Sequence, residues 1–130
     1  MADTNEKNMI PENGKDRSAE LARIAISALE DKKAEDVRVI DIGDVSVLAD
    51  YFIIANGNNR TQVQAMADEV EQRLGRAGAE PKQIEGYQTG NWVLLDFGDV
   101  IIHIFDAPNR LFYDLERIWK DGRQIDPDQL

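Results

Sequence analysis

The sequence has no cysteine and only one histidine among its 130 residues. Disulfides and thiolate metal ligands are therefore excluded, and one histidine cannot complete a nitrogen-and-sulfur zinc site. Serine is scarce, no Gly-x-Ser-x-Gly segment occurs, and no glycine-rich phosphate loop with its lysine is present. We therefore expect a protein that is not an enzyme and that needs no cofactor or metal.

Long apolar runs are also missing. No stretch approaches the roughly 18 apolar residues that a membrane-spanning helix needs. The first residues, MADTNEKNMIPENGKDR, are polar and mixed in charge, without the apolar core of a signal peptide. Together with the lack of cysteine, this predicts a cytoplasmic protein with no membrane partner.

Basic residues are outnumbered by acidic ones, 15 to 25, which gives a net charge of −10. Phosphate backbones repel such a chain, so we expect no sequence-specific binding to nucleic acid. A basic protein would instead be steered toward it. The charge could equally serve solubility alone.

The apolar pattern divides the chain into a polar tail over residues 1–16, one domain over 17–121 and a C-terminal tail over 122–130. Periods of 3.6 and 2 residues alternate within the domain. The expected elements are a helix from Ser18, as its N-cap, to Glu30 or Asp31; strands over 37–42 and 50–56; a helix capped by Asn58 or Asn59 and ended by Gly75 or Gly78; a short edge strand around Ile84; two strands within 90–105; and a last helix over 107–119. The order αββαβββα predicts an α/β fold with a mixed sheet of about five strands and helices packed on it.

Residues 90–105, GNWVLLDFGDVIIHIF, predict a hairpin with Gly98 and Asp99 as its two-residue turn. The resulting register places alternate side chains on two faces. One face is wholly apolar and should be the core side: Val93, Leu95, Phe97, Val100, Ile102 and Ile104. The other is apolar with two polar insertions, and is either covered by a helix or offered to a partner: Trp92, Leu94, Asp96, Ile101, His103 and Phe105.

Three side chains on the second face have both a structural and a functional interpretation. A lone histidine such as His103 is more often a hydrogen-bonded structural residue than a base or ligand. Asp96 beside the turn could satisfy backbone donors or contact a partner. Trp92 could be a core aromatic residue, although tryptophan is also the residue type most enriched at binding hot spots.

Four aspartates at or near predicted strand ends support a weaker alternative, a nucleotide-binding module or enzyme that holds a divalent cation: Asp41, Asp50, Asp96 and Asp106. Their spacing matches no metal-binding motif. The segment ANGNNRT before the second helix has the setting of a phosphate site, but helix capping explains it better.

Segments in this order resemble the ribosomal silencing factor family, also called RsfS or Iojap: DYFIIANGNNRTQVQAMADEVEQRL, EG, WVLLDFGDVIIHIF and RLFYDLERIW. The match covers roughly residues 18–120. The resemblance implies a fold related in topology to nucleotidyltransferases, but without catalysis. It also implies binding to the large ribosomal subunit through its basic ribosomal protein number fourteen, which would block joining of the small subunit and repress translation. A homodimer is implied as well.

Carried over by position, the resemblance assigns a first group of residues to the ribosomal-protein contact: Trp92, Asp96 and Phe97, with Gly98 and Asp99 as the turn of the motif. A second group matches signature positions and could serve either contact or fold: Asp50, Tyr51, Arg110 and Tyr113. His103 remains a structural or partner-binding candidate. The segment DAPN before the last helix departs from the polar or acidic residues that many members have there, which leaves that region's contacts undecided.

Overall fold

Six strands pair into one mixed sheet in this computed structural model, which describes residues 14–44, 46–47, 49–107 and 122–130. The strand order is β3-β4-β5-β2-β1-β6, with β2 and β5 parallel and the other neighbours antiparallel. The elements are α2 (Gly14–Asp31), β1 (Glu35–Asp41), β2 (Tyr51–Gly57), α3 (Arg60–Arg76), β3 (Gln83–Glu85), β4 (Trp92–Asp96), β5 (Val100–Asp106), β6 (Arg123–Ile125) and a 3-10 turn, η1 (Pro127–Gln129). The predicted α/β fold with a mixed sheet is confirmed.

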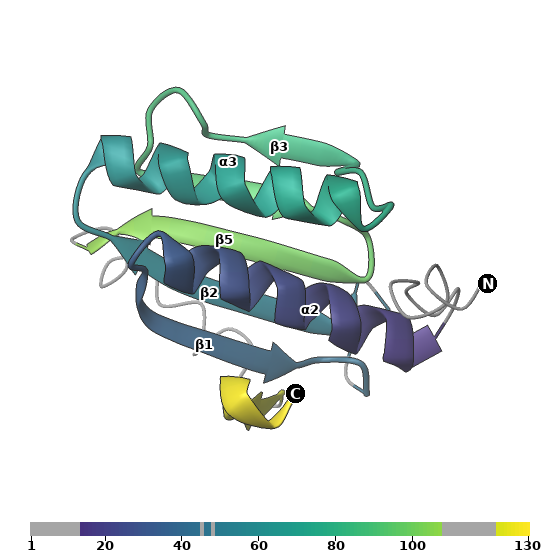
Figure 1. The fold of residues 1–130 in the computed structure, drawn as a ribbon. Helices are drawn as coiled ribbons and strands as arrows, with labels where there is room; N and C mark the ends of the chain where they lie inside the picture. The colour runs from purple at the N-terminus through teal and green to yellow at the C-terminus, as the bar shows by residue number, and fades with distance from the viewer. Residues whose placement is uncertain (1–13, 45, 48, 108–121) are drawn as a thin grey trace.

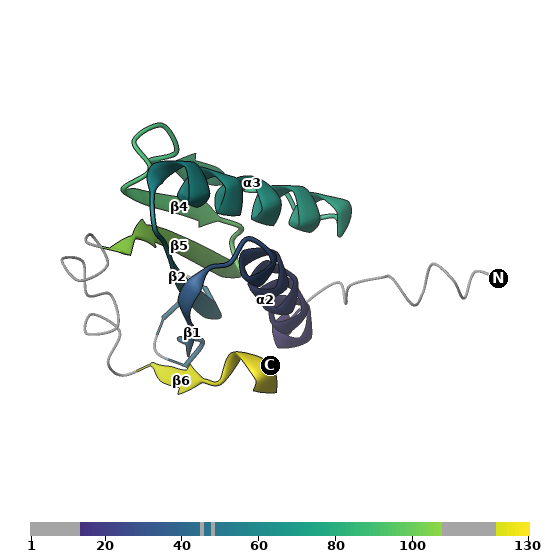
Figure 2. The same ribbon diagram turned by 60° about the vertical axis from the view of Figure 1, so that its left-hand side comes forward.

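Helices α2 and α3 lie side by side on the same face of the sheet (Figures 1 and 2). We call this the helix face and its reverse the outer face. Alternate residues of β1, β2, β4 and β5 point to the helix face and join the helices in one buried cluster, in which Val39, Ile53, Leu95 and Ile102 take part. The outer face carries a smaller buried cluster: Ile40, Ile42, Ala49, Phe52, Ile54 and Phe105. The near-continuous apolar sequence of β2 follows from burial on both faces.

Helix α3 follows its predicted pattern closely. The side chain of Asn59 accepts a hydrogen bond from the Gln62 backbone N–H at 2.8 Å, which caps the first turn. The predicted stripe is the buried one: Val63, Met66, Ala67, Val70 and Leu74. The helix ends at Arg76, so Gly75 lies in its last turn and Gly78 just beyond it.

Helix α2 begins at Gly14, one turn before the predicted start, and the prediction of Ser18 as its N-cap is wrong. Ser18 lies inside the helix, where its side chain is buried. Its hydroxyl donates to the Asp50 carboxylate, 2.5 Å away. Serine is a typical capping residue, but here it contacts the distant Asp50 from inside the helix. Local sequence does not reveal such a tertiary contact.

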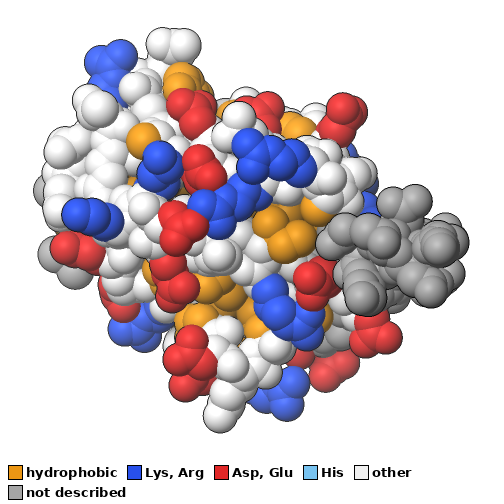
Figure 3. Space-filling view, in the orientation of Figure 1, with side chains coloured by type: hydrophobic (Ala, Val, Ile, Leu, Met, Phe, Trp, Pro, Cys, Tyr) orange, Lys and Arg blue, Asp and Glu red, His pale blue; other side chains and the backbone are white. Residues whose placement is uncertain are grey.

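Salt bridges link the two helices on their solvent side. Arg73 of α3 donates to Asp31 of α2, and its Nε lies 2.6 Å from a Glu69 carboxylate oxygen. Figure 3 shows acidic and basic side chains interspersed over this side of the molecule. The solvent side of the helices is therefore an ordinary surface of mixed charge.

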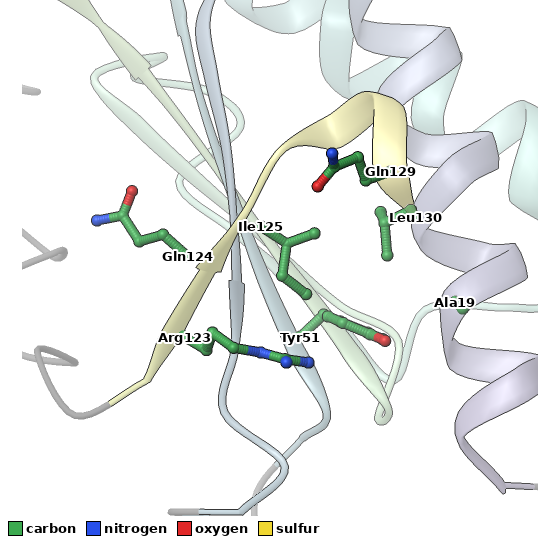
Figure 4. Close-up of a pocket in the computed structure, with 7 residues that line it drawn as sticks. All are labelled: Ala19, Tyr51, Arg123, Gln124, Ile125, Gln129 and Leu130. Atoms are coloured by element: carbon green, nitrogen blue, oxygen red, sulfur yellow. The ribbon is translucent and has the colours of Figure 1, made fainter.

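The predicted C-terminal tail over residues 122–130 is not a tail, because Arg123–Ile125 forms the edge strand β6 beside β1. Ile125 and Leu130 pack against the helix-face cluster, and Arg23 of α2 donates to the Leu130 carbonyl at 2.7 Å. A shallow cavity of about 410 Å³ lies beside the strand, and Ile125 and Leu130 point toward it together with Tyr51 (Figure 4). Two apolar residues in nine were too few to reveal a strand by pattern.

The predicted last helix over residues 107–119 lies almost wholly outside the described residues, as do Arg110 and Tyr113. Within the part of the chain that the structure describes, no helix is long and apolar enough to cross a membrane.

Candidate functional site

The hairpin of β4 and β5 has the predicted register, with Trp92 opposite Phe105 and Asp96 opposite Ile101. Both predicted faces are therefore confirmed. On the outer face, four side chains at the β4 end of the sheet are only partly buried: Trp92, Leu94, Asp96 and Ile101. We call these four residues the outer strip. It places an aromatic ring at one end of β4 and a carboxylate at the other.

Trp92 is held by contacts with Phe105 and His103. Its ring stacks on Phe105 with 5.2 Å between centroids and 28° between planes. Its indole Nε1–H donates to Nδ1 of His103 across the strand pair, at 3.0 Å. Because an indole has a single donor, this bond fixes the direction in which the ring lies.

His103 is the buried support of this arrangement, with 4% of its surface exposed. Burial lowers its pKa from 6.5 to about 4, so the ring is neutral at physiological pH. Since Nδ1 accepts from Trp92, the proton resides on Nε2, which is buried and has no hydrogen-bond partner among the residues that the structure describes. The ring also meets Phe52 edge to face, with centroids 5.0 Å apart.

An aliphatic residue would fill the position of His103 without burying an unpaired N–H, which costs about 1–3 kcal/mol. What the imidazole supplies is an acceptor for Trp92. The structure therefore assigns His103 to the support of the outer strip and removes it from direct contact with solvent.

A shallow depression of about 340 Å³ lies next to the strip, lined by Glu85, Gly86, Trp92 and Leu94. Gly86 has a φ of +79°, and a Cβ built on it would lie 2.0 Å from the Trp92 carbonyl oxygen. Only glycine allows the loop to approach the start of β4 so closely. Sequence pattern alone does not reveal Glu85 and Gly86 as neighbours of Trp92, and the available signal is a glycine shortly before a strand.

The turn at the other end of β4 depends on the backbone conformation and hydrogen bonding of Gly98. Gly98 has a φ of +88°, a conformation that side chains other than glycine rarely adopt. Its N–H donates to Oδ1 of Asp96 at 2.8 Å, so this carboxylate does satisfy a backbone donor, as one interpretation held. Asp99 is exposed. The turn thus carries two carboxylates, one bound to the backbone and one facing water.

Phe97 is placed differently from the resemblance. Its side chain is 7% exposed and belongs to the helix-face cluster. Strand alternation carries it away from Asp96 and onto the opposite face. The structure agrees with the core position that the register predicted, and the contact role that the resemblance implies for Phe97 stays a prediction.

Of the signature residues that the structure describes, Tyr51 is buried at the start of β2, and Asp50 is partly exposed just before it. Register places Asp41, Asp50 and Asp96 at one end of the sheet and Asp106 at the other. Asp41 is bound to Arg123 at 3.2 Å and to the Gly43 N–H at 3.0 Å. Among the described residues, no three carboxylate or histidine side chains gather closely enough to hold a metal ion.

Comparisons with known proteins place this geometry in one family. The family model "Ribosomal silencing factor during starvation" matches residues 15–130. A ribosomal silencing factor RsfS of Halalkalibacterium halodurans is 41% identical over 107 residues, which cover 82% of this chain and 92% of that protein. The chloroplastic protein Iojap of Arabidopsis thaliana is 36% identical over 84% of this chain and 44% of its own length.

Two solved structures share the fold. A crystal structure from Bacillus halodurans superposes with a TM-score of 0.74 at 39% identity, covering 82% of this chain and 97% of that one. One from Chromobacterium violaceum gives 0.76 at 36% identity, over 82% and 88%. These matches agree with the family resemblance of the sequence, and the chain belongs to the ribosomal silencing factor family.

Proposed function

We propose that this protein binds the large ribosomal subunit through its basic ribosomal protein number fourteen, with the outer strip and the Gly98–Asp99 turn as the contact. Once bound to the large subunit, the protein would sterically keep the small subunit from joining it. Translation would then be repressed without any chemical step. The family membership supports the ribosomal role. The observation that carries the surface is the partly exposed Trp92, fixed in direction by His103 and Phe105.

The composition of the strip suits such a partner. A rigid, partly exposed tryptophan is the side chain that most often dominates a protein interface. Asp96 and the exposed Asp99 add negative charge at the far end of β4, and the chain as a whole carries −10. Charge of this sign attracts a basic protein and is repelled by ribosomal RNA. We therefore place the contact on a protein of the subunit, in the cytoplasm.

Sedimentation of isolated ribosomal subunits in a sucrose gradient tests the proposal. Saturating protein should keep the subunits separate under ionic conditions in which they otherwise join, and the protein should travel with the large subunit. Normal formation of complete ribosomes at saturating protein would contradict it.

A matched pair of charge reversals localises the contact. Asp99→Lys changes an exposed side chain of the turn and leaves its backbone bonds in place. Glu71→Lys makes the same change of net charge on an exposed position of α3, on the helix side. Only Asp99→Lys should weaken binding to the large subunit. Equal losses in both variants would mean that net charge, and not this surface, governs binding.

The strip is also a candidate surface for a homodimer, because Trp92, Leu94 and Ile101 leave part of an apolar surface exposed. Sedimentation at increasing concentration would detect a dimer. If the two interfaces overlap, Trp92→Ala should weaken dimer and ribosome binding together. If they are distinct, only ribosome binding should fall.

A further inference from the structure

The Gly98–Asp99 turn is fastened to the start of β2 by its backbone. The carbonyl oxygen of Asp99 accepts hydrogen bonds from the N–H groups of Asp50 at 2.8 Å and Tyr51 at 3.2 Å. Two donors on one carbonyl fix the direction of the peptide group that follows Asp99. The position from which the exposed Asp99 side chain projects is therefore set by the segment that holds Asp50.

Asp50 is in turn bound through its other polar groups. Its carboxylate accepts from the hydroxyl of Ser18, with 2.5 Å between Oγ and Oδ2. Its carbonyl accepts from the Ile42 N–H at 2.9 Å, just after β1. One residue thus joins helix α2, the end of β1 and the turn.

Ser18 is an unusual residue at its position. It is fully buried, 0% exposed, within a helix whose other buried positions are apolar. Serine is a poor residue for a helix interior, because its hydroxyl competes for backbone hydrogen bonds. Here the hydroxyl makes a short bond to a carboxylate, the kind of hydrogen bond that charge strengthens. The link between α2 and Asp50 is therefore strong enough to hold a loop residue.

We propose that Ser18 and Asp50 are positioning residues for partner binding. The chain of bonds Ser18–Asp50–Asp99 sets the orientation of the turn relative to helix α2. The inference rests on the proposed function of the turn and deepens it. It assigns Asp50, which the resemblance left open between contact and fold, to holding the contact surface from behind.

Two matched pairs of variants test this role. Ser18→Ala removes the hydroxyl, and Ser27→Ala makes the same change at an exposed position of the same helix, where the hydroxyl accepts from Arg73 at 3.2 Å. Asp50→Ala removes the carboxylate, and Asp44→Ala removes an exposed one in the loop that follows β1. Each pair loses the same atoms and the same charge, and only the first member of each pair loses the bond between Ser18 and Asp50.

Two measurements are made on each folded variant. Hydrogen exchange by NMR follows the amides of Asp50 and Tyr51, which donate to Asp99, and the amide of Ile102 as a reference in β5. Binding to isolated large ribosomal subunits gives the affinity. In Ser18→Ala and Asp50→Ala, the amide protons of Asp50 and Tyr51 should exchange at least about tenfold faster than in the controls, while the exchange rate at Ile102 stays unchanged. The same two variants should bind the large subunit about tenfold more weakly than their controls.

The outcomes separate this inference from the proposed function. If the parent protein binds but Ser18→Ala and Asp50→Ala bind as tightly as their controls, the pair is only structural and the inference is wrong. Unchanged exchange at Asp50 and Tyr51 would contradict it as well. If the parent itself does not bind the large subunit, the proposed function fails first. Should Ser18→Ala not fold, Asp50→Ala, at a partly exposed position, decides alone.

Discussion

The two faces of the sheet are built from the same strands and look alike in sequence, yet they differ in what they hold. On the helix face, β4 and β5 present buried apolar side chains up to the last residue of β5, the partly exposed Asp106. On the outer face the same two strands present the half-buried strip together with His103 and Phe105. Ile101 and Ile102 are neighbours in sequence, but the first is partly exposed and the second wholly buried.

If the outer strip is the contact surface that we propose, the difference shows how a sheet separates stability from recognition. A face that only has to exclude water can use aliphatic side chains throughout, and helices α2 and α3 complete it. A face that presents a surface needs side chains held in one direction while part of them stays exposed. Trp92 meets that need through its hydrogen bond to His103 and its ring stack on Phe105. Because these contacts set direction, the proposed function predicts that they matter more to recognition than to stability.

The largest expected effect is a loss of stability caused by a substitution on the helix face. Ile102→Ala should lower the free energy of unfolding by about 3 kcal/mol, because it leaves a cavity in a fully buried site. Ile101→Ala, one residue away and partly exposed, should cost about 1 kcal/mol or less. Urea denaturation of both variants measures the contrast. Equal losses would mean that the two faces contribute alike to stability.

The sequence predicted the parts of the fold that depend on local periodicity. The stripe of α3, its Asn59 cap and the hairpin register all follow from spacing within about twenty residues. It missed β6, whose three residues are held by pairing with β1, some eighty positions earlier in the chain. It also misplaced the start of α2, since the partner of Ser18 is Asp50 and not the helix itself. Contacts between distant segments leave no periodic trace.

The candidate site was predictable in composition and less so in geometry. Alternation placed Trp92, Asp96 and His103 on one face, and it placed Phe97 on the other against the resemblance. It could not show that the Trp92 N–H meets Nδ1 of His103, because that bond depends on two side-chain rotamers. A lone histidine on such a face predicts a hydrogen-bonded structural residue, and in the structure the buried ring accepts a hydrogen bond from Trp92.

The next effect concerns recognition on the outer face. Trp92→Ala should weaken binding to the large ribosomal subunit by about 2 kcal/mol or more, as expected for a central interface tryptophan. Trp92→Phe keeps an aromatic ring over Phe105 but removes the N–H, so its loss should be smaller. Binding is measured by cosedimentation. A folded Trp92→Ala protein that binds as tightly as the parent would show that the strip is not the interface.

A pH dependence of comparable size should come from His103. Its pKa is about 4 in the folded protein and near 6.5 in the unfolded chain, so the unfolded state gains a proton first as pH falls. The stability that this histidine contributes is thus present above pH 6.5 and is lost between pH 6.5 and 4. Between pH 7.5 and 5 the loss should reach about 2 kcal/mol.

The control for this titration is His103→Leu, which replaces the imidazole with an apolar side chain of similar size and removes the proton-binding site. Carboxylates titrate in both proteins, so the difference between their unfolding curves isolates the histidine. The parent should lose about 2 kcal/mol more than His103→Leu over this range. Parallel curves would show that the ring is not buried in its neutral form.

The smallest expected effect on stability is at the edge of the helix face, where an ion pair joins β6 to β1. Arg123 of β6 donates to Asp41 of β1, with side chains 77% and 6% exposed. An arginine so exposed is well solvated without its partner, so Arg123→Ala should cost about 0.5 kcal/mol in urea denaturation. Asp41 keeps its bond from the Gly43 N–H, which limits the loss further. A cost above about 2 kcal/mol would mean that β6 is held mainly by this pair, and that apolar packing is not what closes this edge of the helix face.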